Sequence, residues 1–204
     1  MSQLGFYLDV SSCSGCKACQ VACKDRHGLE TGRLWRRVAE IEGGEWRREG
    51  EAWRPTVFAY SLSISCLHCA EPACVAACPS AAIEKDPDEG LVSVDEARCL
   101  GCRYCSWACP YGVPQFAEAA GTMSKCDTCV EDRQEGRPPT CVAACPLRAL
   151  DFGELEDLRR RHGTLDTLPP LPDGSITRPS VVITPPAALG AEPVVVVNAE
   201  EIQR

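Results

Sequence analysis

The chain has 204 residues, of which 16 are cysteine and only 3 are histidine, and its 29 acidic and 21 basic side chains give a formal net charge of −8. This acidic balance argues against nucleic-acid binding, which needs a basic surface. No apolar run of about 18 residues is present, so we expect no transmembrane helix. The first residues lack the cationic and apolar segments of a secretory signal, which makes a disulfide scaffold improbable.

The cysteines fall into four groups of four with none left over. They are group I (Cys13, Cys16, Cys19, Cys23), group II (Cys66, Cys69, Cys74, Cys78), group III (Cys99, Cys102, Cys105, Cys109) and group IV (Cys126, Cys129, Cys141, Cys145). Groups I and III share the spacing C-x2-C-x2-C-x3-C, and with Pro110 group III completes the run typical of bacterial ferredoxins. Groups II and IV widen the middle gap and end in Cys-Pro. This spacing predicts iron–sulfur ligation.

The elements between the groups are predicted in chain order. Residues 34–65 read as a β-rich insertion, with a hairpin suggested by Gly43–Gly44. Strands that brace the clusters are suggested there by Trp46, Trp53, Phe58, Tyr60 and the alternating stretch 61–64. Residues 82–94 read as a second hairpin around a turn rich in Asp, Pro and Gly. Residues 154–162 predict a short helix with Leu155 and Leu158 facing inward, and the Pro-rich stretch from Thr167 to Pro193 predicts an extended tail. The proline after a fourth cysteine suits the first position of a short helix.

An internal repeat organises the chain. The letters CVAACP at 74–79 recur at 141–146, which indicates duplication of a cluster-binding unit. Residues 66–109 form one complete unit, so groups I and IV must pair across the sequence as a split unit made of 1–33 and 110–153. The predicted fold class is α+β, with two ferredoxin-like modules, one nested inside the other, added β-hairpins, and a region 154–204 whose tail docks on partner subunits.

The spacing also predicts how the thiolates are shared. Three cysteines within seven residues can hold three irons of one cluster, whereas the fourth, about one helical turn further on, ligates the other cluster of the pair. Four [4Fe–4S] clusters are therefore expected, in set A (Cys13, Cys16, Cys19, Cys145), set B (Cys126, Cys129, Cys141, Cys23), set C (Cys66, Cys69, Cys74, Cys109) and set D (Cys99, Cys102, Cys105, Cys78).

Zinc is the main alternative to iron–sulfur clusters. Structural zinc sites use two close cysteine pairs separated by a longer loop. Group IV alone fits that pattern, because the extra middle cysteine of groups I and III breaks it. Disulfides are a weaker alternative still.

Other polar residues have plainer interpretations. His68 could replace a cysteine ligand, but every group already has four cysteines, so a backbone or solvent role is favoured. The cations beside the groups either raise cluster potentials or only aid solubility; they are Lys17, Lys24, Arg103, Lys125 and Arg148. The run 159–162 could touch anionic lipid or an acidic partner, or compensate a helix dipole. No phosphate loop and no nucleophile–base pair is present, so no catalytic residue is predicted.

At this point the chain resembles a known family. Segments including CSGCK at 13–17, VFAYSLSISC at 57–66, GCRYC at 101–105, ACPYG at 108–112 and CPLRALDFG at 145–153 are similar to those of the four-cluster iron–sulfur subunits of the dimethyl sulfoxide reductase family of molybdenum enzymes. The likeness covers about 1–180 and is greatest to the dimethyl sulfoxide reductases. It implies an electron-transfer subunit without catalytic activity of its own.

The resemblance further implies two partners, a molybdopterin catalytic subunit with molybdenum or tungsten and a quinone-reactive integral membrane subunit. Electrons would pass between them, in a complex of the S- or N-oxide reductase type used in anaerobic respiration. Polysulfide, tetrathionate, sulfite or formate oxidoreductases, and a free polyferredoxin, are the alternatives. The chain would lie on the cell membrane through its complex, on the periplasmic side if it is exported folded with its catalytic partner.

Overall fold

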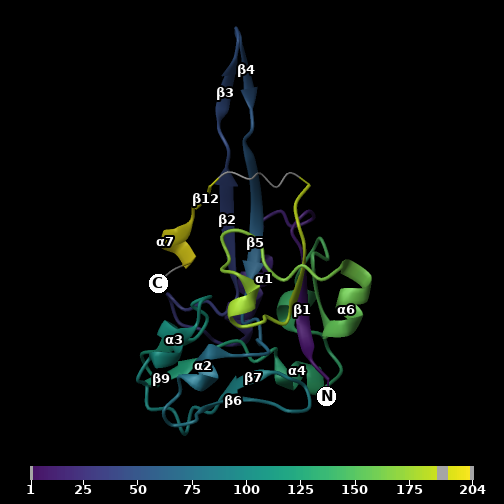
Figure 1. Ribbon diagram of the computed structural model, residues 1–204. Helices are drawn as coiled ribbons and strands as arrows, with labels where there is room; N and C mark the ends of the chain where they lie inside the picture. The colour runs from purple at the N-terminus through teal and green to yellow at the C-terminus, as the bar shows by residue number, and fades with distance from the viewer. Residues whose placement is uncertain (1, 188–192, 203–204) are drawn as a thin grey trace.

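The computed structural model describes residues 2–187 and 193–202, which form two three-stranded sheets, three two-stranded hairpins and several short helices (Figure 1). The strands are β1 (Leu4–Asp9), β2 (Arg37–Gly43), β3 (Trp46–Glu49), β4 (Ala52–Pro55), β5 (Phe58–Ile64), β6 (Ile83–Lys85), β7 (Val92–Val94), β8 (Gln115–Ala117), β9 (Thr122–Ser124), β10 (Leu150–Glu154), β11 (Val181–Thr184) and β12 (Val194–Val196). The helices are α1 (Ala18–Arg26), α2 (Ala73–Ala76), α3 (Tyr104–Ala108), α4 (Val130–Gln134), α5 (Thr140–Ala143), α6 (Leu155–His162), α7 (Ala199–Ile202) and the 3-10 helix η1 (Gly174–Ile176). This mixture confirms the α+β prediction.

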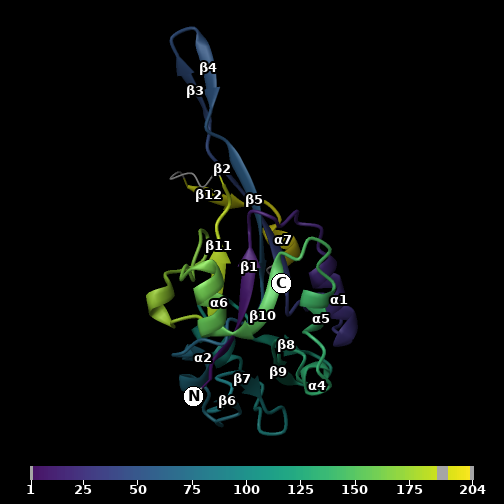
Figure 2. The ribbon, with the colours of Figure 1, turned by 90° about the vertical axis from the view of Figure 1, so that its right-hand side faces the viewer.

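The first sheet has the order β10-β1-β11, with β1 antiparallel to β10 and parallel to β11. The middle strand β1 is buried on both faces. Phe6 and Leu8 face the main core, whereas Tyr7 packs with Leu155 and Leu158 of α6, which covers the other face (Figure 2). The inward position predicted for the two leucines is confirmed.

The second sheet, of order β12-β2-β5, continues into a long arm. Strands β2 and β5 run on into the β3–β4 hairpin, which projects far from the body in both views (Figures 1 and 2). The arm turns at residues 50–51, so the turn suggested at Gly43–Gly44 is wrong. Gly44 instead lies where the two strands approach closely, and its φ is +80°. A side chain does not fit there, because a Cβ would lie 2.2 Å from the Thr56 carbonyl oxygen.

The aromatic residues of this insertion divide between core and arm. Phe58 and Tyr60 of β5 are buried in the main core, as expected of strands that brace the cysteines. Trp46 and Trp53 are about three-fifths exposed, at 59% and 61%, because they lie on the projecting hairpin. The expectation that these two tryptophans brace the clusters is therefore wrong.

Two shorter hairpins lie between successive cysteine groups. Strands β6 and β7 pair antiparallel, which confirms the hairpin predicted over 82–94, and β8 pairs with β9 between groups III and IV. Ile83, Val92 and Met123 form a small core with Cys74 and Cys105. This core is separate from the larger one under the two three-stranded sheets.

The Pro-rich tail folds back on its own chain over part of its length. Residues 181–184 form β11, which is almost wholly buried beside β1, because the run VVIT is apolar and β-branched. β12 adds to the second sheet. Residues 188–192 of the predicted tail lie outside the described residues, and docking of the tail on partner subunits stays a prediction.

The prolines after the fourth cysteines end helices and do not begin them. Pro79, Pro110 and Pro146 follow α2, α3 and α5 and lie in turns. The expected short helix after the proline is wrong, since the helical turn lies before the fourth cysteine. A proline there stops the helix because its ring would clash with the preceding turn.

Candidate metal-cluster site

Residues with left-handed backbone conformation bend each cysteine loop around its thiols. Lys17 and Arg103 occupy equivalent positions in groups I and III, and their φ angles are 61° and 64°. Such turns aim backbone N–H groups inward, which suits anions. In group III the amides of Gly101 and Met123 donate to Cys99 Sγ at 3.4 and 3.3 Å. The loop is therefore built to hold a negatively charged sulfur.

The repeat seen in the sequence has the same geometry in both copies. Ala82 N donates to Cys78 Sγ at 3.2 Å, and Ala149 N donates to Cys145 Sγ at 3.2 Å. After each copy the chain enters a strand, β6 in one case and β10 in the other. The two fourth cysteines are thus held in the same way.

The partner strands repeat as well. β7 leads to group III as β1 leads to group I, and β6–β7 matches β10–β1. Asp95 N donates to the Ala82 carbonyl at 2.7 Å, and Asp9 N donates to the Ala149 carbonyl at 2.8 Å. Helix α2 contacts α3, and α1 contacts α5. These contacts bring group II beside group III and group I beside group IV. The division of the chain into a continuous and a split unit stays a prediction.

Two of the four predicted sets surround cavities. One cavity is lined by all four thiols of set A together with Val38, Ser63 and Leu147. Another is lined by all four thiols of set C together with Tyr111 and Lys125. In each cavity the fourth cysteine comes from the other group of the pair. Ligation of a cluster by these four thiols stays a prediction.

Sets B and D show the same gathering through their electrostatics. Burial, with the nearby thiols Cys141 and Cys129, raises the pKa of Cys23 to about 12. Burial, with Cys99, Cys102 and Cys78 nearby, raises the pKa of Cys105 to about 11. Uncharged thiols do not bind iron, so loading of these sites releases protons. All sixteen thiols are free of disulfides, which fits a donor set for clusters.

The four sets follow one another through the molecule. Cys19 of set A lies near Cys141 of set B, and Cys126 of set B lies near Cys66 of set C. Sets C and D share helix α3, which carries Cys105 and is followed at once by Cys109. Only Cys16 of set A and Cys102 of set D are exposed. The order A, B, C, D therefore runs from one exposed thiol to another through a buried middle.

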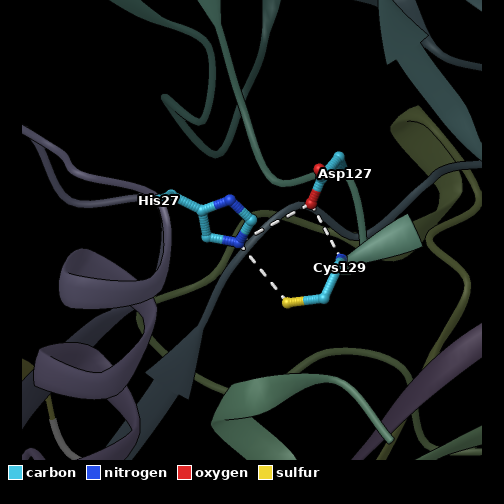
Figure 3. A group of neighbouring side chains, drawn as sticks. All are labelled: His27, Asp127 and Cys129. Carbon is cyan, nitrogen blue, oxygen red and sulfur yellow. Dashed lines mark hydrogen bonds and ion pairs between the residues drawn. The ribbon is translucent and has the colours of Figure 1, made fainter. Parts of the chain in front are cut away.

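A side chain missed in the sequence contacts set B. His27 Nε2 lies 3.4 Å from Cys129 Sγ and 3.7 Å from Asp127 Oδ1, and Cys129 N donates to the same Asp127 oxygen at 2.8 Å (Figure 3). The His27 ring packs against Trp35, with 4.5 Å between centroids. Burial lowers the pKa of His27. Its position just beyond α1, four residues after Cys23, is the signal that could have found it.

The residues singled out beside the groups behave differently from one another. His68 is buried, and its Nδ1 accepts a hydrogen bond from Val92 N at 3.0 Å, so it shapes the backbone and does not face solvent. Lys17 pairs with Glu40 and Glu201. Lys125 is buried and donates to backbone carbonyls beside set C.

The rest of these cations lie nearer the surface. Arg103 pairs with Glu118, Lys24 donates to the carbonyls of Glu30 and Arg33, and Arg148 is exposed. Arg159 and Arg160 form ion pairs within α6. Such exposed pairs contribute little to stability. Over residues 2–187 and 193–202, no helix is long and apolar enough to cross a membrane.

Known proteins are similar to this chain in sequence. Residues 57–155 match the 4Fe-4S dicluster domain family. The sequence is 51% identical over 186 residues to one chain of the anaerobic dimethyl sulfoxide reductase of Escherichia coli, covering 91% of the present protein and 90% of that relative. It is 36% identical to one subunit of the sulfite dehydrogenase of Allochromatium vinosum, covering 77% and 71% of the two proteins.

A more distant relative is the iron-sulfur subunit of the nitrate-inducible formate dehydrogenase of Escherichia coli, at 33% identity over 74% of the present protein and 54% of that relative. By name, all three relatives are chains or subunits of oxidoreductases, and the formate dehydrogenase relative is an iron-sulfur subunit. The free thiols, the inward amides and these similarities agree on an iron–sulfur protein. The chain belongs to the family of iron–sulfur electron-transfer subunits of oxidoreductase complexes, in which the anaerobic dimethyl sulfoxide reductases of Escherichia coli are represented.

Proposed function

We propose that the chain holds four [4Fe–4S] clusters, one in each of the sets A to D, with ligation crossed within the pairs of groups I–IV and II–III. Such clusters take up and release single electrons, which protein side chains of this type do not do by themselves. The sixteen free thiols, gathered four by four, support this count. The protein's part is to fix the thiols, aim amides at them and exclude water from the middle sets.

The chain would carry electrons between a quinone-reactive membrane subunit and a molybdopterin catalytic subunit. The observation that carries this proposal is the order of the sets, which runs from exposed Cys16 to exposed Cys102 through buried thiols. A path with two exposed ends suits a carrier between two partners. The name of the 51% identical relative favours a reductase of S- or N-oxides.

The complex would lie on the cell membrane, on the periplasmic side if the chain is exported with its catalytic partner. A sulfite or formate oxidoreductase is a second candidate, which the relatives at 36% and 33% identity support. Substrate assays of the complex separate the candidates.

Iron and sulfide analysis of the anaerobically purified chain tests the first part of the proposal. About sixteen irons and sixteen sulfides per chain are expected for four clusters. Mainly zinc, or only about four irons in a fully loaded sample, would contradict it.

Reconstitution with the partner subunits tests the second part. Quinol should reduce the clusters only when the membrane subunit is present, and an S- or N-oxide should reoxidise them only with the catalytic subunit. The isolated chain should turn over neither compound. Turnover of either by the isolated chain would refute the carrier role.

A further inference from the structure

Arg36 is a cation in the middle of the protein. Its side chain is among the largest fully buried ones, with 2% of the residue exposed. Nη1 donates to the carbonyl and to the hydroxyl of Ser63, both at 3.2 Å, and Nη2 donates to Ser65 Oγ at 2.9 Å. The guanidinium carbon lies 4.7 Å from the centre of the Phe6 ring. These partners are all uncharged.

No carboxylate in residues 2–187 and 193–202 forms an ion pair with Arg36, and its buried Nε has no hydrogen-bond partner there. Arginine keeps its charge in proteins, so this site holds an uncompensated positive charge away from water. A buried charge needs an opposite charge nearby if the fold is to tolerate it.

The surrounding anions can only be the cysteines. Burial opposes the charge of Arg36, but the thiolates of Cys141 and Cys19, followed by those of Cys126 and Cys23, raise its pKa overall. Cys19 belongs to set A and the other three to set B. When loaded, each set would carry about −2, from a core of about +2 and four thiolates.

Ser63 connects the guanidinium to set A. Its hydroxyl oxygen accepts from Arg36 Nη1 and lies 3.3 Å from Cys19 Sγ. Because the arginine can only donate, the hydroxyl proton of Ser63 is left to point at the sulfur. A hydrogen bond to a ligand sulfur and a nearby positive charge both favour the reduced, more negative form of a cluster.

We propose that Arg36 is a counter-cation shared by sets A and B, which raises the reduction potential of both clusters, and that Ser63 orients toward Cys19 under its control. This inference rests on the proposed four-cluster content. The positive charge of Arg36 would offset the effect of burial on the clusters, because a dry interior by itself disfavours the extra negative charge of a reduced cluster. Electrons would then pass through the buried clusters of the path without meeting one of very low reduction potential.

Redox potentiometry with EPR detection on the full-length, cluster-loaded chain tests the inference. Arg36→Gln should lower the potentials of two of the four clusters, with about a tenfold fall in the ratio of reduced to oxidised cluster at a given potential, or about 59 mV for one electron. Arg36→Lys, which keeps the charge, should restore most of the shift. Cys16→Ser, which alters set A, identifies the signal of that set.

Two further variants make the test specific. Ser63→Ala should lower the potential of set A alone, and by less than Arg36→Gln. Arg160→Gln removes one positive charge from an exposed side chain of α6 and should move no potential. Iron analysis and the visible spectrum confirm loading in each variant.

Unchanged potentials in a fully loaded Arg36→Gln chain would overturn the inference, as would an equal shift of all four clusters. If Arg36→Gln loses clusters, the Ser63→Ala variant decides, because an unmoved set A would then refute the role of the pair. Failure of the proposed function looks different: the wild-type chain itself would lack four EPR-detectable clusters.

Discussion

The proposed continuous unit, residues 66–109, and the proposed split unit, residues 1–33 and 110–153, follow the same path around their cysteines but are supported differently. The continuous unit closes with the three residue pairs of β6–β7 over a small core. The split unit closes with five pairs between β1 and β10 over the main core, and β11 of the C-terminal region adds four more pairs on the other edge of β1. Ends separated by a long intervening chain lose more entropy when they meet, so they need more pairing.

The largest effect is expected from replacing the cysteine that crosses to the other group in each unit. Cys78→Ser should disturb the cluster held by Cys99, Cys102 and Cys105 and leave set C intact. Cys145→Ser should likewise disturb set A, because Cys145 is the proposed fourth ligand of the cluster held by Cys13, Cys16 and Cys19. EPR spectra of the two purified variants, with iron analysis, measure this.

The opposite pattern would contradict crossed ligation. If Cys78→Ser damaged the cluster of Cys66, Cys69 and Cys74 first, each group would close on its own cluster. Ser93→Ala, at an exposed position of β7 and with the cysteines intact, serves as a control and should keep all four signals.

Removal of iron should reveal a difference in amide protection between the two units. With a chelator under reducing conditions, we expect amides of the continuous unit to lose protection first, because β6–β7 and its small core are marginal alone. Amides of β1 and β10 should stay protected longer, since β1 is covered on both faces. Hydrogen exchange by mass spectrometry measures the order. Simultaneous loss in both units would mean that the clusters, and not the sheets, hold the split unit together.

Truncation in the main core should cost a moderate amount of stability. Leu8 is 1% exposed in β1, and Leu8→Ala should lower the free energy of unfolding by about 2–5 kcal/mol. Leu100→Ala, at a position 70% exposed, should change it by about 0.5 kcal/mol or less. Chemical denaturation of the loaded chains compares them. Equal effects would show that β1 is not the support of the split unit.

The smallest effect concerns a contact between the two parts of the split unit. Asp132 of α4 accepts from Arg26 Nε of α1 at 3.0 Å and from Thr140 at 3.2 Å, and Arg26, followed by Arg137, lowers the pKa of Asp132. Because the pKa of Asp132 is lower in the folded state than in the unfolded state, where it is near 3.9, the ionised carboxylate stabilises the fold at pH values above about 3.9. This stabilisation is lost as the pH falls toward the pKa of the folded state.

Asp132→Asn should therefore lower Tm by about 2–4 °C at pH 7, with a difference from wild type that narrows below about pH 4. Thermal scans that follow cluster absorbance measure both quantities. Asp88→Asn, in an exposed turn, should match wild type throughout. A difference that stays constant with pH would assign the effect of Asp132 to shape and not to charge.

Local patterns were predictable where one stretch of chain decides the outcome. The hairpin at 82–94 and the helix at 155–162 follow from turn residues and apolar spacing. The turn near Gly43–Gly44 failed because two glycines also suit a close approach of strands, which continue to residues 50–51. The exposure of Trp46 and Trp53 depends on how far that arm projects, which composition does not encode.

By itself, the sequence determined the chemistry of this protein: sixteen cysteines in ferredoxin spacing, a duplicated CVAACP segment and a resemblance to iron–sulfur subunits. These are local features, since ligand spacing within a few residues follows from the geometry of one loop. Only the tertiary structure decided which thiols lie exposed, that β11 pairs with β1 at the edge of the first sheet, and that Arg36 and His27 lie near the cysteines. Those facts depend on packing between segments far apart in the chain, because burial and charge proximity arise only when such segments meet.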